Sequence, residues 1–273
     1  IGTCLKEIGS SYVVIQGDTS SAFAGAVAGF LLKIPVGHVE AGLRSHDLSS
    51  PFPEEGYRSM ISRITTHHFA PTTAAVDNLI SEGITESSIH LVGNTVVDSI
   101  VKYSSFSIQN TKVKKVLVTL HRRENFGQPL RDIAAAIKDF ALEELAVQMN
   151  VIIHPNPNSG LVLKELLADL VNVNLLEPLT YVDLLHEIRT SHFVLTDSGG
   201  IQEECAVLGS TLLIARNETE RPEVLSESRM LIGTNRERVY AALKTEVRRD
   251  TQFMEYPDLN LAILGDGQSS SRI

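Results

Sequence analysis

The chain has 273 residues, enough for one large domain or two ordinary ones. Its 43% hydrophobic and 21% charged residues are typical of a folded globular protein rather than a disordered one. The formal net charge of -9, spread along the sequence, argues against a nucleic-acid or anionic-membrane binder, which normally carries a basic patch. Cys4 and Cys205 lie far apart, which disfavours a disulfide framework and indicates a reducing, cytoplasmic compartment.

The sequence predicts neither a transmembrane helix nor a signal peptide. The longest apolar run, from Ala22 to Leu32, falls short of the roughly 20 residues that a transmembrane helix needs, so a buried helix is expected. The start of the chain shows no basic region followed by an apolar core, and no signal peptide is predicted. Because Ile1 is not a natural initiator, we expect residues to be missing upstream.

Short β-branched runs alternate with helical patterns along the chain. The strand-like runs are uniformly apolar, which is typical of parallel strands buried on both faces. In chain order they are Tyr12–Gln16, Ile34–Val39, His68–Ala70, His90–Val92, Val116–Leu120, Val151–His154, Val173–Leu176, Phe193–Thr196, Leu212–Ala215 and Met230–Ile232. The helical stretches between them include Ser20–Leu32, Glu54–Ile64, Thr73–Glu82, Asp132–Phe140 and Val182–Arg189. This alternation predicts parallel sheets with right-handed crossovers.

A polar stretch, Ser104 to Lys115, separates two such series and is the expected linker. The prediction is an α/β protein with two Rossmann-like domains whose parallel sheets face a cleft. Residues 1–107 form the first domain and residues 108–254 the second, and residues 255–273 pack back toward the first. Because ligands of open parallel sheets bind at the carboxyl ends of the strands, polar motifs at those ends are the candidate site.

Two such motifs follow the first strands. Gly17-Asp18-Thr19 is read equally well as a turn with a helix N-cap or as part of a site. Glu40 ends the next strand, on the same face as His38 by the period of two. An acid at this position favours a functional role over a surface salt bridge with Arg44.

A proline and two acids, Pro53-Glu54-Glu55, begin the next helix. Negative charge is favourable in the first turn of a helix, and this is the simpler role for Glu55. Glu54 is a candidate for the cleft.

Three potential cations, His121-Arg122-Arg123, directly follow the Val116–Leu120 run. Cations gathered at a strand end are costly unless they meet an anion. We therefore expect a diphosphate there rather than a solvated basic loop.

A glycine-rich turn opens a helix in the second domain at Asp197-Ser198-Gly199-Gly200. Backbone N–H groups at such a helix N-terminus bind phosphate, although Asp197 or Ser198 equally suits an ordinary N-cap. Glu204 lies one helical turn beyond Gly200, where a carboxylate can accept hydrogen bonds from a ribose diol.

Taken together, these motifs resemble the UDP-N-acetylglucosamine 2-epimerase family. They occur in the family's order over essentially the whole chain, and the ordered set is far more specific than any one motif. The stretches that carry the resemblance are Gly17-Asp18-Thr19, His38-Val39-Glu40-Ala41-Gly42-Leu43-Arg44, Pro53-Glu54-Glu55, Gly93-Asn94-Thr95, His121-Arg122-Arg123-Glu124-Asn125, His154-Pro155-Asn156-Pro157, Asp197-Ser198-Gly199-Gly200-Ile201-Gln202-Glu203-Glu204, Thr219-Glu220-Arg221-Pro222-Glu223 and Gly265-Asp266-Gly267.

The resemblance implies the two-domain GT-B fold and the interconversion of UDP-GlcNAc and UDP-ManNAc. It implies elimination of UDP to a 2-acetamidoglucal and re-addition with inversion at C2, without a nicotinamide or metal cofactor. No metal site is expected from the residues either, since His67 and His68 point to opposite faces of a strand. The resemblance further implies a cytoplasmic homodimer that serves polysaccharide biosynthesis.

The resemblance also implies the roles of single residues. Acid/base chemistry falls to the carboxylates Asp18, Glu40 and Glu54, and His121 faces the leaving diphosphate. The phosphate, ribose and sugar contacts come respectively from the loop Ser198, Gly199 and Gly200, from Glu204, and from Arg221. In the non-hydrolysing bacterial branch, which the motifs favour, a second UDP-GlcNAc binds as an activator. The residues that match its site are Glu54, Arg122 and His154.

Three alternatives stay open. They are a hydrolysing 2-epimerase that releases ManNAc, a GT-B glycosyltransferase, and an inactive nucleotide-sugar-binding fragment. The family begins with a Gly-Thr-Arg-Pro-Glu loop, whereas here Gly2-Thr3 is followed by Cys4-Leu5. We therefore expect an incomplete first domain and no epimerase activity from this chain alone.

Overall fold

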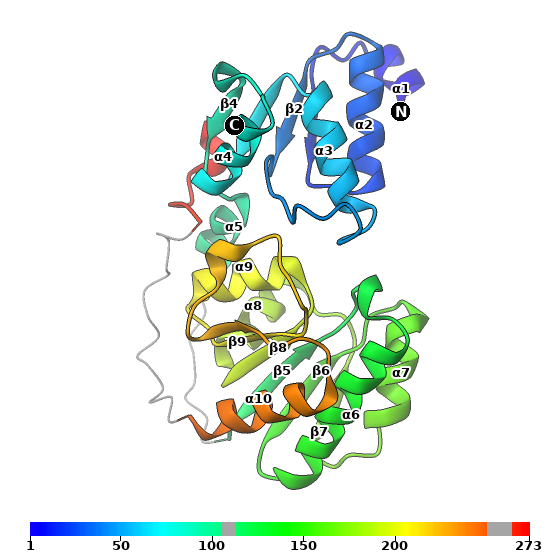
Figure 1. Ribbon diagram of the computed structural model, residues 1–273, viewed down its shortest axis with the longest axis vertical. Coiled ribbons are helices and arrows are strands. Elements are labelled where there is room, and N and C mark those ends of the chain that lie inside the picture. The colour runs from blue at the N-terminus through cyan, green and yellow to red at the C-terminus, as the bar shows by residue number, and fades with distance from the viewer. Residues whose placement is uncertain (105–112, 250–263) are drawn as a thin grey trace. The chain divides into compact units, whose positions relative to one another are not determined.

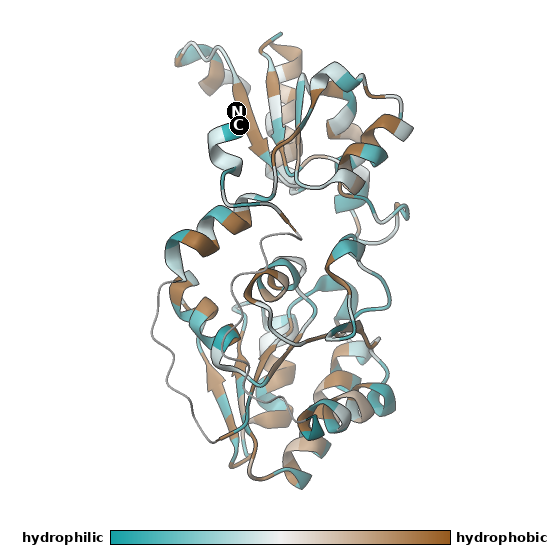
Figure 2. Ribbon diagram, turned by 90° about the vertical axis from the view of Figure 1, so that its left-hand side faces the viewer, coloured by the Kyte–Doolittle hydropathy of each residue, from teal (hydrophilic) through white to brown (hydrophobic). Residues whose placement is uncertain are grey.

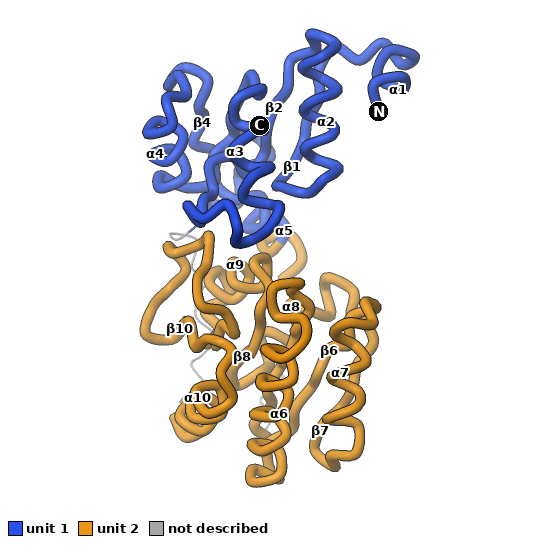
Figure 3. The backbone as a smooth tube through the Cα atoms, turned by 45° about the vertical axis from the view of Figure 1, so that its right-hand side comes forward, with its two compact units in different colours: residues 1–99, 264–273 blue, residues 100–263 orange. Residues whose placement is uncertain are grey.

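The computed structural model describes residues 1–104, 113–249 and 264–273. The chain forms two compact units, residues 1–99 with 264–273 and residues 100–263 (Figure 3). The divisions predicted from the sequence lie at 107/108 and 254/255. Most of the linker expected from Ser104 to Lys115 lies outside the described residues.

The first unit contains a four-stranded parallel sheet in the order β1-β2-β3-β4. Its strands are β1 (Val13–Gln16), β2 (Val36–Val39), β3 (His67–Ala70) and β4 (Ile89–Leu91). Its helices are α1 (Gly2–Glu7), α2 (Ser20–Leu31), α3 (Glu54–Ile64), α4 (Thr73–Ser81) and α11 (Ser269–Arg272), with the 3-10 turn η1 (Glu86–Ser88). A further helix, α5 (Thr95–Tyr103), crosses the division between the units. Helices α2 and α3 lie beside β1 and β2 (Figure 1). Ile15 of β1 belongs to one buried cluster with Ala26 of α2 and Ile61 of α3.

Strand β1 forms one edge of this sheet and is buried on one face only. Val13 and Ile15 point into the core, whereas Val14 between them is 61% exposed. The expectation that this apolar run is buried on both faces is therefore wrong for β1. Its alternation of buried and exposed residues is that of a half-covered strand.

The C-terminal residues 264–273 belong to the first unit. The Asn94 amide donates a hydrogen bond of 2.7 Å to the Leu264 carbonyl oxygen. The Asp98 carboxylate accepts hydrogen bonds from the backbone amides of Ser269 and Ser270, at 3.1 and 2.9 Å. The structure thus brings Gly93-Asn94-Thr95 against Gly265-Asp266-Gly267, two motifs far apart in the sequence.

The second unit contains a six-stranded parallel sheet in the order β10-β9-β8-β5-β6-β7. Its strands are β5 (Lys115–Thr119), β6 (Gln148–Ile152), β7 (Val173–Leu176), β8 (Phe193–Thr196), β9 (Leu212–Ile214) and β10 (Arg229–Leu231). Its helices are α6 (Gln128–Glu143), α7 (Pro157–Leu167), α8 (Tyr181–Thr190), α9 (Gly199–Leu208) and α10 (Arg236–Arg248), with the 3-10 turns η2 (Arg123–Asn125) and η3 (Pro222–Val224). All pairings in this sheet are parallel, as predicted.

The core of the second unit lies between the sheet and helices α6, α7 and α10, where Phe140, Leu163 and Leu243 are fully buried. Helices α8 and α9 pack against each other and lie against the sheet (Figure 1). The helices show both hydrophobic and hydrophilic stretches in Figure 2, as expected of amphipathic helices on a sheet. Within the described part of the chain, none of the helices combines the length and the hydrophobicity needed to span a bilayer.

Candidate active site

The first unit places two candidate carboxylates at the carboxyl ends of neighbouring strands. Asp18 follows β1 and Glu40 follows β2, and these strands pair in parallel. Gly17 and Glu40 both have positive φ angles, 71° and 68°, which turn the chain sharply at each strand end. A Cβ atom on Gly17 would lie only 3.7 Å from Glu40 Oε2, so the Glu40 carboxylate lies beside the loop that carries Asp18.

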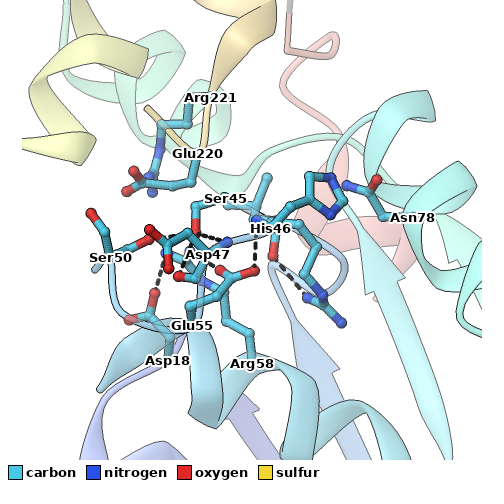
Figure 4. A network of polar contacts seen from close by, with 12 residues as sticks. Asp18, Ser45, His46, Asp47, Ser50, Glu55, Arg58, Asn78, Glu220 and Arg221 are labelled. Carbon is cyan, nitrogen blue, oxygen red and sulfur yellow. Dashed lines mark hydrogen bonds and ion pairs between the residues drawn. The ribbon is translucent and has the colours of Figure 1, made fainter. Parts of the chain in front are cut away.

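The motif Gly17-Asp18-Thr19 suggests a helix N-cap and a site residue, and different residues of the motif fill these two roles. Thr19 is the N-cap of α2, and its hydroxyl accepts a hydrogen bond of 3.3 Å from the Ala22 amide. Asp18 instead forms an ion pair with Arg58 of α3 (Figure 4). Arg58 was not among the predicted site residues. The sequence feature that could have identified it is its place four residues after Glu54 and three after Glu55, on one face of a helix.

Helix α3 begins with two adjacent acids in different environments. Glu54, its first residue, is half-buried, and Glu55 is buried. Glu55 accepts hydrogen bonds from the His46 amide at 3.2 Å and from Arg58 Nη1 at 3.0 Å. Glu55 therefore ties the loop after β2 to α3, a structural role that agrees with the expectation for a first-turn acid.

Two other residues of the β2 motif have structural contacts. The buried guanidinium of Arg44 pairs with Glu82 at 2.7 Å and donates to Ser62 Oγ at 2.9 Å. His38 Nε2 donates to the Gly17 carbonyl oxygen at 2.9 Å, and burial lowers the pKa of His38 to about 4. His38 is thus neutral at physiological pH and holds together the two loops that carry Asp18 and Glu40.

In the second unit, the fully buried Asp197 joins the loops after β5 and β8. These strands are parallel neighbours, so their carboxyl ends meet at one edge of the sheet. The Asp197 carboxylate accepts hydrogen bonds of 3.0 Å from the backbone amides of His121 and Arg122 and from Asn125 Nδ2. Asp197 is therefore the residue that fixes the cationic loop.

His121 is half-buried and has charged neighbours. Its Nδ1 lies 3.8 Å from Asp197 Oδ1, and its ring stacks on that of His154, with 5.0 Å between centroids. Burial is the main cause that lowers the pKa of His121, while Asp197 acts in the opposite direction. Both histidines line a pocket of about 170 Å³ at the ends of β5 and β6. Its other walls are formed by Thr119, Leu120, Ile152, Pro178, Leu179, Leu184 and Ile201.

The predicted phosphate loop lies at the N-terminus of α9. Ser198 is the N-cap residue, without a side-chain capping hydrogen bond, and Gly199 and Gly200 form the first turn. A Cβ atom on Gly199 would lie 2.7 Å from Arg221 Nη1 and 3.1 Å from Arg122 Nη2. Glycine at this position therefore lets two guanidinium groups approach the end of the helix, where the helix dipole also favours an anion.

Glu204, the predicted ribose ligand, lies one turn further along α9. Burial, with the neighbouring Glu203, raises the pKa of Glu204 to about 7. Tyr181, at the start of α8, interacts with Glu204, and burial and this carboxylate raise the pKa of Tyr181. Tyr181 had no signal in the sequence, because only the packing of α8 on α9 brings it to Glu204.

The structure thus gathers the predicted residues in two places. Within the first unit, Asp18, Glu40 and Glu54 lie on the segments that follow β1 and β2. Within the second unit, one edge of the sheet carries the remaining predicted residues, namely His121, Arg122, His154, Ser198, Gly199, Gly200, Glu204 and Arg221. Among the residues that the structure describes, no three His, Cys, Asp or Glu side chains form a group that can hold a metal ion.

Comparison with known proteins places these motifs in a family. The model of the family described as UDP-N-acetylglucosamine 2-epimerase matches residues 1–273. The UDP-N-acetylglucosamine 2-epimerase of Salmonella borreze is 37% identical over 99% of this chain and 77% of its own length. That of Bacillus subtilis strain 168 is 40% identical over 98% of this chain and 72% of its own length.

Solved structures agree. The crystal structure of UDP-GlcNAc 2-epimerase from Neisseria meningitidis bound to UDP-GlcNAc has a TM-score of 0.91 and 33% identity. The match covers 99% of this chain and 76% of that one. The predicted α/β, GT-B-like fold and the predicted family are confirmed.

Proposed function

This chain belongs to the UDP-N-acetylglucosamine 2-epimerase family, and we propose that it interconverts UDP-GlcNAc and UDP-ManNAc by inverting C2. The observation that carries the proposal is the placement of Asp18 and Glu40 after the parallel neighbours β1 and β2. A glycosyltransferase of the same fold shares the phosphate and ribose contacts but has no need of these carboxylates.

In the proposed reaction, a carboxylate removes the proton from C2 of the sugar. The electron pair of that C–H bond forms the C1=C2 double bond of a 2-acetamidoglucal, and the C1–O bond breaks with its electrons leaving on UDP. UDP then adds back to C1, and an acid returns a proton to C2 on the opposite face. Two groups on opposite faces of the sugar are required, which favours a site with several carboxylates.

Asp18, Glu40 and Glu54 are the proposed acid/base groups. Arg58 contacts the Asp18 carboxylate through an ion pair and so fixes its orientation. His121 is proposed to face the leaving diphosphate. The diphosphate is also proposed to accept hydrogen bonds from the backbone amides at the start of α9, in the loop Ser198, Gly199 and Gly200, because N–H donors stabilise a departing anion.

Glu204 and Arg221 are proposed to bind the ribose and the sugar side. A second UDP-GlcNAc is proposed to act as an activator at Glu54, Arg122 and His154. The stacking of His154 on His121 supports this role, since it gives a regulatory residue direct contact with a catalytic one. We further propose that the enzyme works as a cytoplasmic homodimer in polysaccharide biosynthesis.

Turnover of UDP-GlcNAc in D2O tests the proposal, and any product from residues 1–273 would overturn the expectation that this chain alone is inactive. We expect UDP-ManNAc with deuterium at C2, because the proton that returns comes from solvent. Free ManNAc with UDP would instead identify the hydrolysing type. UDP binding without any product would identify an inactive nucleotide-sugar binder, and product that retains its original hydrogen at C2 would exclude elimination.

A further inference from the structure

A cluster of three arginines surrounds one carboxylate beside the N-terminus of α9. The carboxylate of Glu220 is fully buried. Its Oε1 accepts a hydrogen bond of 3.1 Å from Arg122 Nη2 and another from Arg221 Nη1. Its Oε2 forms an ion pair of 2.9 Å with Arg216 Nη2. One side chain thus contacts arginines from three segments, namely the loop after β5, the end of β9 and the start of η3.

Two further carboxylates belong to this cluster. Glu203 pairs with Arg221, at 2.6 Å between Oε1 and Nε, and Glu124 Oε1 lies 4.0 Å from Arg122 Nη1. The guanidinium groups lie at a helix N-terminus, which adds positive potential. Arg122 is the most exposed of the three arginines, with 21% of its side chain accessible.

On the basis of the function proposed above, we infer that Glu220 is a positioning residue for diphosphate binding. It acts through Arg122 and Arg221, which contact the phosphates in addition to the activator and the sugar side assigned to them above. Its carboxylate holds Arg122 and Arg221 at the end of α9, in the place where Gly199 leaves room for them. Without this carboxylate, three buried or half-buried cations would repel one another, and Arg122 would turn toward solvent. The arginines would then no longer be pre-organised to bind the phosphates.

The comparison of UDP with uridine separates positioning from a merely structural role. Uridine lacks the phosphates, so loss of the arginine geometry weakens binding of UDP but not of uridine. For Glu220→Gln we expect UDP affinity to fall about 10- to 100-fold, as for the loss of charged hydrogen bonds. The affinity for uridine is expected to stay unchanged. NMR titration of the protein with each ligand measures both affinities. Glu218→Gln is the matched control, because Glu218 is exposed two residues away.

Gly199→Ala provides a second route to the same geometry if the Glu220 variant folds poorly. Its Cβ would displace Arg221 and Arg122 from Glu220, so UDP affinity should fall while uridine affinity stays unchanged. Because both substitutions act through the same arginines, their effects should be non-additive in the double variant.

The outcomes distinguish this inference from the proposed function. A wild-type protein that binds UDP no more tightly than uridine would contradict the proposed function itself. A wild-type protein that prefers UDP, with a Glu220→Gln variant that keeps the same preference, would overturn only the role of Glu220. Equal weakening of UDP and uridine in both variants would also overturn it, because that pattern indicates general damage to the fold.

Discussion

The imidazole rings of His121 and His154 stack with 5.0 Å between their centroids and 14° between their planes. Burial is the main cause that lowers the pKa of His121, and the Coulombic interaction with the His154 ring lowers it further, because two parallel imidazoles at this distance resist being protonated together. The other charged groups near His121 are Asp197 and Glu124, which raise its pKa, and Arg122, which lowers it.

We therefore expect His154→Gln to raise the pKa of His121, because glutamine cannot be protonated and the Coulombic interaction with residue 154 is lost. An NMR titration of the His121 ring measures this pKa directly. In the pH–rate profile, the limb that belongs to His121 should move to higher pH by the same amount. A His121 pKa that stays the same or falls would show that the stacked rings do not interact electrostatically.

The carboxylates after β1 and β2 are predicted to act in proton transfer. Asp18→Asn and Glu40→Gln keep the size of the side chain and remove its charge, so kcat should fall by about 10²- to 10⁴-fold. UDP affinity should change little, because the proposed nucleotide contacts lie in the second unit. Asp77→Asn on the exposed face of α4 is the control. Near-normal kcat in both variants would reduce Asp18 and Glu40 to structural roles.

The fold was largely predictable from the sequence, because β-branched runs and helical patterns alternate clearly. The runs Val173–Leu176 and Phe193–Thr196 are β7 and β8 to the residue. Strand β6 was misplaced toward its carboxyl end, since it begins with the polar Gln148 and contains Asn150. The pattern could not show that the side chain of Asn150 is hydrogen-bonded to Glu187 of α8 and to Asn174 of β7.

The contacts that hold the site together were harder to predict. Strand-end motifs identify Asp18 and Arg122 as candidates, but a sequence does not show which partner the fold brings to each. Arg58 reaches Asp18 from another helix, and Glu220 gathers arginines from three segments. Such partners depend on packing between elements that are distant in the chain.

Glu204 makes the stability of the protein depend on pH. Its folded-state pKa of about 7 lies above the ordinary value of 4.5 because burial penalises the charged form. The folded state therefore binds the proton more tightly than the unfolded state, and stability falls as the pH rises from about 4.5 to about 7. The loss is at most about 3 kcal/mol.

Glu204→Gln should remove this contribution. We expect the variant to melt above the wild type at pH 8 and the difference to disappear below about pH 4.5, where Glu204 is protonated in both states. Thermal unfolding across this pH range measures the effect. A variant that is less stable than the wild type at pH 8 would show that the charged carboxylate is stabilised by its surroundings.

The loop after β2, which carries Glu40, depends on a glycine that no other residue can replace. Gly42 has a φ of 89°, and a Cβ atom there would lie 2.2 Å from the Ala75 carbonyl oxygen. The clash is with the backbone of α4, which cannot move as a side chain can. The Gly42 carbonyl oxygen also accepts a hydrogen bond of 3.0 Å from Asn78 Nδ2.

Three Gly→Ala variants separate the effect of backbone strain from the effect of the steric clash. Gly56 lies within α3 with open space around it, so Gly56→Ala should stabilise the protein by about 0.5–1 kcal/mol. Gly83 has a φ of 80° and also open space, so Gly83→Ala should cost about 1 kcal/mol from backbone strain alone. Gly42→Ala combines strain with the backbone clash and should cost about 3 kcal/mol or more. Urea unfolding of the three variants measures these differences.

The same substitution connects the fold to the proposed chemistry. Relief of the clash requires the loop to lift from α4, and that movement displaces Glu40, two residues away, from its place beside Gly17. Gly42→Ala should therefore lower kcat under conditions where the variant is still folded, whereas Gly83→Ala should not. If Gly42→Ala were no less stable than Gly83→Ala, contact with α4 would not fix this loop. The position of Glu40 would then depend only on strand β2, which it follows.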